Sequence, residues 1–182
     1  MTTAPWVEVF GNARPVEIEI GPGRGDVLLA YAAARPDTNF FGIERLAPLA
    51  GVIVAAATAR GLSNVQAIGG DARCILAVLL PDACVQAYHV YFPDPWPKTR
   101  QRKRRLFHGG TLAADMARTL VPGGAVHLAS DLPGLVEQMA TALRAAGLQQ
   151  EGEAISPPAW PRTKYERRYA ISGTHRTSLH RP

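Results

Sequence analysis

Short apolar or alternating runs of strand length recur along the chain, separated by longer segments in which apolar residues are spaced three or four apart. The first pattern is typical of strands and the second of amphipathic helices. The runs predict strands at 16–20, 39–43, 65–68, 85–92 and 125–130, and two more near 148–154 and 167–172. The intervening segments predict helices at 26–34, 48–61, 72–80, 110–120 and 135–146.

Repeated strand–helix units predict an α/β fold, because parallel strands need a crossover connection that packs a helix on the sheet. We therefore expect a doubly wound, mostly parallel seven-stranded sheet with helices on both faces. A chain of 182 residues is long enough to bury one core. We expect a single domain over residues 1–182, opened by a short N-terminal segment, 1–15.

Glycines or acidic side chains follow the carboxyl end of each of the first five predicted strands. They are Gly21–Gly25, Glu44, Asp71, Asp94 and Asp131. Doubly wound sheets bind their ligands at the carboxyl ends of the strands, so we expect these residues to converge on one site.

Composition and charge limit the partners of this site. Apolar residues make up 47% of the chain, but no apolar run reaches the ~20 residues that cross a bilayer. With no secretory signal and only two cysteines, the sequence predicts a cytoplasmic protein without a membrane partner or a metal site.

Charge is distributed unevenly along the chain. Residues 1–97 carry six Lys and Arg against nine Asp and Glu, whereas residues 98–182 carry fourteen Lys and Arg against six Asp and Glu. This asymmetry favours a cationic small molecule beside the first part and a polyanion along the second.

The glycine loop after the first strand, Glu19-Ile-Gly21-Pro-Gly23-Arg-Gly25, indicates what kind of small molecule binds. Glycines let the backbone approach a ligand closely, because they have no β-carbon. A dinucleotide-binding loop would have glycine at position 26 and dock a pyrophosphate there, but Asp26 would repel it. Glu19 likewise favours a ligand that carries positive charge.

The segment 91–105 holds a carboxylate in a rigid turn next to a basic run. Asp94 lies between Pro93 and Pro95, with Trp96 beside it, and prolines restrict both their own φ and the preceding residue. Six of the eight residues 98–105 are basic. An aromatic ring for stacking, cations for phosphate and an acid for a base edge suit a nucleobase. On spacing alone, a proline-rich turn before a solvated basic helix fits equally well.

The pattern ExGxGxG from Glu19 to Gly25 resembles the first motif of class I S-adenosylmethionine-dependent methyltransferases. The segment Tyr91-Phe-Pro-Asp-Pro-Trp-Pro-Lys98 resembles, more specifically, a signature of the bacterial tRNA (guanine-N7-)-methyltransferases. That family methylates N7 of a guanine in the tRNA variable loop. Further similarities to it are Pro36-Asp-x-Asn-Phe-x-Gly-Ile-Glu44, Gly61-Leu-Ser-Asn-Val65, Leu120-x-Pro-Gly-Gly124, Ser130-Asp131 and Arg162-Thr-Lys-Tyr-Glu166.

The resemblance implies a role for each candidate residue. Asp94 is the candidate catalytic residue. S-adenosylmethionine would contact Asp94 and also Glu19, Gly21, Gly23, Gly25, Glu44 (on the ribose) and Asp71 (near the adenine). The implied substrate contacts are Lys98, Asp131, Thr163, Lys164, Tyr165 and Glu166, and the implied tRNA-backbone contacts are Arg100, Arg102, Lys103, Arg104 and Arg105. We expect tRNA as the partner, a monomer or homodimer, and no metal.

The chemistry of guanine N7 defines what Asp94 would do. N7 carries a free lone pair at neutral pH, so its methylation needs alignment and negative charge near the developing positive ring. No general base is required. We therefore expect Asp94 to position and stabilise rather than to accept a proton.

Several of these residues also fit other local roles. Asp71 and Asp131 each fit a helix N-cap, Glu44 an exposed loop acid, and Thr163–Glu166 a capped turn. His89 is expected to be a buried structural residue. For the whole chain, the alternatives are a methyltransferase acting on another RNA or a small molecule, and a non-catalytic RNA-binding protein of the same fold.

Overall fold

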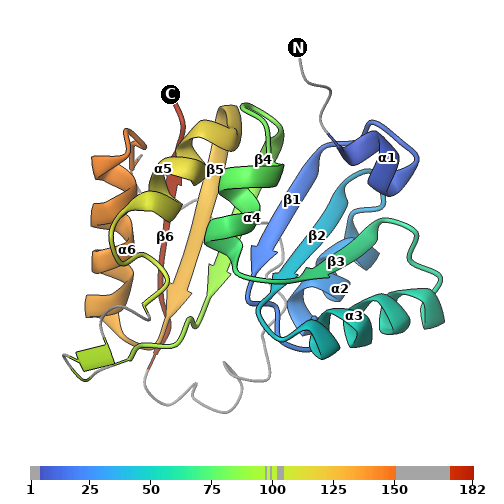
Figure 1. The fold of residues 1–182 in the computed structure, drawn as a ribbon, viewed down its shortest axis with the longest axis horizontal. Helices are drawn as coiled ribbons and strands as arrows, with labels where there is room; N and C mark the ends of the chain where they lie inside the picture. Colours follow the sequence, from blue (N-terminus) through green and yellow to red (C-terminus); the bar gives the residue numbers. More distant parts are fainter. Residues whose placement is uncertain (1–4, 97, 99, 102–104, 151–172) are drawn as a thin grey trace.

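In the part of the chain that the structure describes, six strands form one sheet in the order β3-β2-β1-β4-β5-β6. The computed structural model of the chain (Figure 1) describes residues 5–96, 98, 100, 101, 105–150 and 173–182. The strands are β1 (Val16–Ile20), β2 (Asn39–Glu44), β3 (Val65–Gly69), β4 (Val85–Tyr91), β5 (Leu120–Ser130) and β6 (His175–His180). The helices are α1 (Trp6–Phe10), α2 (Asp26–Ala34), α3 (Ala47–Ala59), α4 (Ala72–Leu79), α5 (Thr111–Thr119) and α6 (Pro133–Ala145).

Strands β1 to β5 run parallel, and β6 runs antiparallel to β5. The chain moves outward from β1 through β2 to β3 and then returns to place β4 on the other side of β1. The strand order therefore reverses between β1 and β4. The connections after these two strands leave in opposite directions, so a crevice opens at their carboxyl ends. These ends point to the bottom of Figure 1.

Helices cover both faces of the sheet, which confirms the doubly wound α/β class. On one face, Ile18 of β1 lies in a core shared with α4, α5 and α6, including Leu76 and Met116. On the other face, Phe40 of β2 lies in a second core shared with α2 and α3, including Ile53. Both cores contain mainly aliphatic side chains, whose burial is the main source of stability in such a fold.

The predicted strands and helices through residue 146 are confirmed, with one boundary clearly displaced. β5 begins at Leu120 rather than at residue 125, because Leu120 pairs with Val85 before a shift of register. Whether residues 120–124 belong to the strand depends on their pairing with β4. The pattern of apolar residues within the segment does not indicate this pairing.

In the C-terminal part, the described strand is not one of the two that were predicted there. Residues 148–150, the described part of the strand expected at 148–154, make a single bridge, between Gln149 and His180. The strand expected at 167–172 lies outside the described residues. The sixth strand is β6, whose sequence His-Arg-Thr-Ser-Leu-His is too polar to show a strand pattern. Its pairing with β5 defines it instead.

Helix α1 was not predicted, because five residues are too few to show a helical period. Trp6 fixes it to the sheet. The indole N–H of Trp6 donates to the carbonyl of Cys84 at 2.7 Å, and its ring lies 5.3 Å from that of Phe41. The segment 1–15, as far as it is described from residue 5, therefore packs on the domain.

Candidate active site

A cavity of about 320 Å³ lies at the carboxyl edge of the sheet, beside the β1–β4 crossover point. The loops that follow β1, β2, β3 and β4 each contribute a predicted residue to its wall: Gly21, Glu44, Asp71 and Asp94. The predicted convergence of these residues is confirmed, although they lie far apart in the sequence. Asp131, which follows β5, does not line this cavity.

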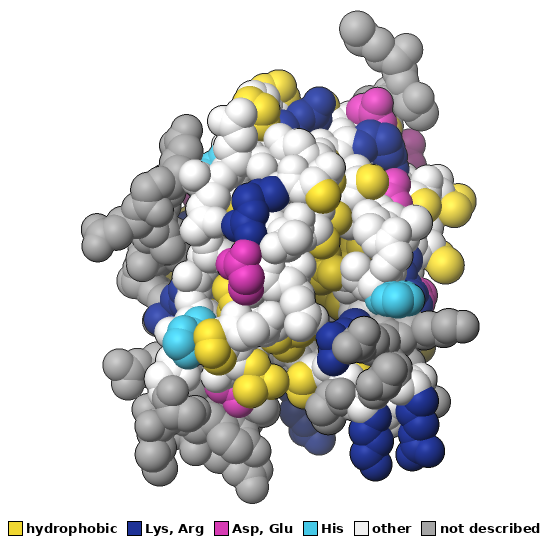
Figure 2. Space-filling model, turned by 90° about the vertical axis from the view of Figure 1, so that its left-hand side faces the viewer, with side chains coloured by type: hydrophobic (Ala, Val, Ile, Leu, Met, Phe, Trp, Pro, Cys, Tyr) yellow, Lys and Arg dark blue, Asp and Glu magenta, His cyan; other side chains and the backbone are white. Residues whose placement is uncertain are grey.

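Exposed cationic side chains surround the same edge. The loops after β1, β2 and β4 carry Arg24, Arg45, Lys98 and Arg100, all of which are exposed. Figure 2 shows Lys and Arg side chains gathered at the lower edge of the face it draws, the edge to which the parallel strands point. Positive charge is therefore found at the same edge of the sheet as the cavity, although acids line the cavity itself.

The glycine loop has left-handed backbone conformations at all three predicted glycines. Gly21, Gly23 and Gly25 have φ of 73°, 58° and 80°. A β-carbon on Gly21 or Gly23 would meet no atom within 4 Å, whereas one on Gly25 would lie 3.0 Å from a side-chain atom of Ile53. The backbone conformation, together with close packing at Gly25, therefore requires glycine here. Space for a ligand remains beside the first two.

Glu44 holds the glycine loop against the start of α3. Its Oε2 accepts from the backbone N–H of Gly23 at 2.9 Å, and its Oε1 accepts from that of Leu46 at 3.0 Å. The side chain is buried at the cavity wall. The alternative that Glu44 is an exposed loop acid is therefore wrong.

Glu19 lies near the end of β1 and is not among the residues that line the cavity. Burial, together with the charges of Asp26 and Glu44, raises the pKa of its carboxyl group to about 8, although a hydrogen bond from the Leu28 backbone lowers it. Within the described part of the chain, its Oε2 is buried and has no hydrogen-bond partner. A buried acid of this kind would be stabilised by a positively charged group placed near it.

Asp71 combines two of its expected features. Its Oδ1 accepts from the backbone N–H of Arg73 at 2.9 Å, so it caps α4. The Arg73 guanidinium also binds both carboxylate oxygens, at 3.0 and 2.6 Å, and this hydrogen bonding lowers the pKa of Asp71. The predicted N-cap is confirmed, and the side chain still lines the cavity.

Asp94 lies in a strained turn directly after β4. Phe92 and Trp96 have φ of 48° and 40°, values that side-chain-bearing residues rarely adopt. Both residues line the cavity together with Asp94, whose side chain is exposed. Local strain of this kind often occurs at functional sites, where the surrounding structure must hold it.

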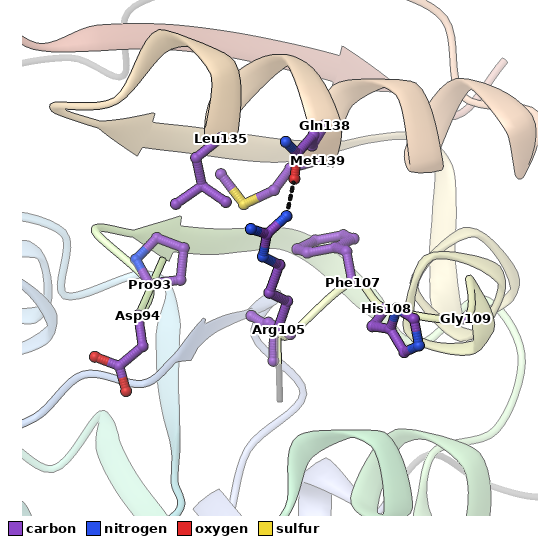
Figure 3. Close-up of a pocket in the computed structure, with 10 residues that line it drawn as sticks. Pro93, Asp94, Arg105, Phe107, His108, Gly109, Leu135, Gln138 and Met139 are labelled. Carbon is purple, nitrogen blue, oxygen red and sulfur yellow. Dashed lines mark hydrogen bonds between the residues drawn. The ribbon is translucent and has the colours of Figure 1, made fainter. Parts of the chain in front are cut away.

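A second cavity of about 380 Å³ adjoins the first and shares Pro93, Asp94 and Leu106 with it (Figure 3). Arg105 and Gln138 line the second cavity. Arg105 was predicted to bind the tRNA backbone, but its guanidinium donates to the carbonyls of Pro95 and Trp96 and to the side-chain oxygen of Gln138. The phosphate contact stays a prediction.

The residues predicted to contact the substrate or the tRNA backbone are only partly described. Lys98 and Arg100 are exposed. Asp131 does not cap α6, because Leu132 is the N-cap residue without a side-chain cap, and Ser130 Oγ accepts the Leu132 N–H at 3.2 Å. That alternative for Asp131 is wrong. The remaining predicted residues, Arg102, Lys103, Arg104, Thr163, Lys164, Tyr165 and Glu166, lie outside the described residues.

The sequence analysis missed several cavity residues, among them two arginines and a leucine beside predicted acids. Arg45 and Leu46 directly follow Glu44, and Arg73 follows Asp71 by two positions. Their position next to predicted acids in the sequence was the signal that could have found them.

Over the described ranges, no group of three or more His, Cys, Asp or Glu side chains could hold a metal. No helix in those ranges has the length and apolar character to cross a membrane.

Known proteins resemble this chain in both sequence and fold. A family described as putative methyltransferases matches residues 13–179. The tRNA (guanine-N(7)-)-methyltransferase of Cupriavidus necator is 38% identical over 169 residues, which cover 90% of this chain and 64% of that protein. The protein of the same name from Alcanivorax borkumensis is 40% identical over 165 residues, which cover 88% of this chain and 69% of the relative. The chain thus spans about two thirds of the length of these relatives.

The crystal structure of the 16S rRNA methyltransferase KamB has the same fold, with a TM-score of 0.71 at 18% identity. The match covers 100% of this chain and 95% of KamB. At that identity the likeness concerns the fold alone. The sequence matches, at 38% and 40% identity, also show the family. On those matches, the chain belongs to the tRNA (guanine-N(7)-)-methyltransferase family.

Proposed function

We propose that this protein transfers a methyl group from S-adenosylmethionine to N7 of a guanine in the variable loop of tRNA. One observation carries the proposal: in a chain of this family, the glycine loop, Glu44, Asp71 and Asp94 converge on one cavity at the strand-order reversal. This is where a doubly wound sheet binds its ligand. The protein would act in the cytoplasm, as a monomer or homodimer.

The residues around the cavity fit S-adenosylmethionine. The Oε2 of Glu19, which is buried without a hydrogen-bond partner among the described residues, suits the positive charge of the methionine portion. Open space beside Gly21 and Gly23 leaves room for that portion. We assign Glu44 to the ribose hydroxyls and Asp71 to the adenine. When bound, the cofactor supplies an electrophilic methyl group on a sulfonium.

Asp94 orients the acceptor and carries the negative charge that the methylated ring needs. The guanine becomes cationic on methylation, and an exposed carboxylate in a rigid turn is a fixed charge that costs no reorganisation during the reaction. Because N7 holds no proton, Asp94 does not act as a base. Asp131 and Thr163–Glu166 are assigned to the edge of the guanine that bears N1–H and the exocyclic amine.

The cations at the carboxyl edge would hold the tRNA backbone. Arg24, Arg45, Lys98 and Arg100 are exposed on the loops after β1, β2 and β4, and each phosphate contact releases a counterion from the nucleic acid. The basic run continues through Arg102, Lys103 and Arg104. A small-molecule acceptor would not need such a surface, which favours RNA among the alternatives.

A labelled-methyl transfer assay with bulk tRNA, followed by strand cleavage specific for N7-methylguanine, tests the proposal. We expect incorporation of label and cleavage in the variable loop. Asp94→Ala should lower turnover on the order of 10²-fold or more, as removal of a transition-state contact does. Cofactor binding without transfer to tRNA would contradict the substrate, and absence of cofactor binding would contradict the enzyme assignment.

A further inference from the structure

We propose that Arg105 is a positioning residue, which holds the turn Pro93–Trp96 in place by linking it to helix α6. The inference deepens the proposed function, since Asp94 and Trp96 of this turn line the cavity assigned to the cofactor. Arg105 was predicted to contact phosphate. The inference gives it a different role, which is to link the turn Pro93–Trp96 to helix α6.

The guanidinium of Arg105 directs its donors at oxygens of two separate elements. Its Nε donates to the carbonyl oxygen of Pro95 at 3.1 Å. Both Nε and Nη2 also donate to the carbonyl oxygen of Trp96, each at 3.3 Å. Its Nη1 donates to Oε1 of Gln138 on α6 at 2.9 Å (Figure 3). A planar fork can hold several fixed acceptors at once, and a lysine ammonium cannot reproduce this geometry.

The turn needs an outside donor for its carbonyl groups. Pro93 and Pro95 have no backbone N–H, so the segment cannot form the usual turn hydrogen bonds at those positions. Phe92 and Trp96 are held at positive φ, a conformation that persists only when neighbouring groups support it. Bonds from Arg105 to the carbonyls of Pro95 and Trp96 give that support at the strained end of the turn.

Helix α6 provides a rigid anchor for this link. Val136, Met139 and Leu143 of the helix are buried in the core against the sheet, while Gln138 faces outward to Arg105. Figure 3 shows the Asp94 carboxylate pointing away from the Arg105 side chain. Arg105 therefore leaves the charge of Asp94 available for the acceptor and controls only where the turn lies.

The variants Arg105→Ala and Arg105→Lys separate positioning from phosphate binding. We expect both to weaken S-adenosylmethionine binding, measured by calorimetry without tRNA, by about tenfold. Turnover should fall by at least as much. Trp96 should become more accessible to acrylamide quenching. Arg144→Ala, at an exposed arginine of the same helix bonded to Glu137, is the matched control and should leave cofactor affinity unchanged.

Gln138→Ala keeps the test valid if the Arg105 variants fold poorly. It removes only the anchor on α6 and should reduce cofactor affinity in the same direction but less, with non-additive effects in the double variant. If Arg105→Lys retains wild-type cofactor affinity and turnover, or if the Arg105 variants lose only tRNA affinity in a salt-dependent way, the proposal is overturned. Since cofactor binding is measured without tRNA, a wrong substrate assignment would leave this test intact.

Discussion

Glu19 and Glu44 show how hydrogen bonding distinguishes two buried acids that the sequence pattern treats alike. Each is a carboxylate at the end of a parallel strand beside the glycine loop. Glu44 accepts backbone N–H groups with both oxygens, from Gly23 and Leu46. Glu19 has an oxygen that is buried without a partner among the described residues, and burial raises its pKa to about 8. Near neutral pH the ligand-free protein therefore keeps a proton on Glu19.

The raised pKa of Glu19 predicts that stability falls as pH rises. Between the unfolded value of 4.5 and the folded value of about 8, the folded protein holds a proton that the unfolded chain releases. The penalty is about 1.4 kcal/mol for each unit of pKa displacement. Glu19→Gln should therefore be more stable than wild type in urea unfolding at pH 8.5 and similar to it near pH 4.5. Equal stability of the two proteins at pH 8.5 would show that Glu19 is not held in a buried, unfavourable environment.

At the scale of elements, a buried polar cluster joins β1, α2 and β4 behind the cavity. Glu17 of β1 accepts from both terminal nitrogens of Arg35, at the end of α2, at 2.7 and 2.8 Å. It also lies 2.7 Å from Nε2 of His89 on β4, whose Nδ1 is 2.5 Å from the Tyr91 hydroxyl. Tyr91 lines the cavity, so this cluster supports the cavity wall. The expectation that His89 is a buried structural residue is confirmed.

Arg35→Ala should destabilise the protein by about 2 kcal/mol, because it leaves a buried carboxylate with one fewer ionic partner. Although burial raises the pKa of Glu17, hydrogen bonds and charges from His89 and Arg35 lower it overall to about 2. The stabilisation is therefore present above pH 4.5 and is lost as pH falls toward 2. Urea unfolding at pH 7 and pH 3 measures both effects. Arg60→Ala, at the exposed end of α3, is the control, and an equal loss in the two variants at pH 7 would contradict the prediction.

At the scale of the whole molecule, positive charge lies at the edge where the strands end. Exposed Arg24, Arg45, Lys98 and Arg100 come from three different loops, and only the parallel sheet brings these loops together. The sequence therefore indicated the basic run after residue 97. The fold adds Arg24 and Arg45, from the net acidic first part of the chain, to the positive charge at this edge. A long-range positive field of this kind accelerates binding of nucleic acid.

Lys98→Glu combined with Arg100→Glu should weaken tRNA binding and lower its dependence on salt. Loss of two phosphate contacts should reduce the slope of log affinity against log salt concentration by about 2. Filter binding at several salt concentrations measures the slope. Arg60→Glu changes charge at the end of α3, shortly before the amino end of β3, and serves as the control. A slope reduced equally by the control would indicate a general charge effect rather than contacts at this edge.

The alternation of strand and helix patterns was enough to predict the fold class, because each element buries its own side chains. Val16–Ile20 and Asp26–Ala34 were predicted to the residue, since a strand pattern, a glycine turn and a helix follow directly. The sequence also selected Gly21, Glu44, Asp71 and Asp94, because parallel topology brings the carboxyl ends of strands to one edge. Local pattern and general topology determine these features.

Only the tertiary structure decided features that depend on partners far away in the chain. β6 is a strand because β5 supplies its hydrogen bonds, and α1 is held by Trp6 against Cys84. The raised pKa of Glu19 arises from burial, and Arg105 binds the Pro93–Trp96 turn and α6 because folding places those oxygens around it. By itself the sequence determined that Gly21, Glu44, Asp71 and Asp94 approach one site. Folding determined their protonation and their contacts, since both depend on distances that no spacing along the chain contains.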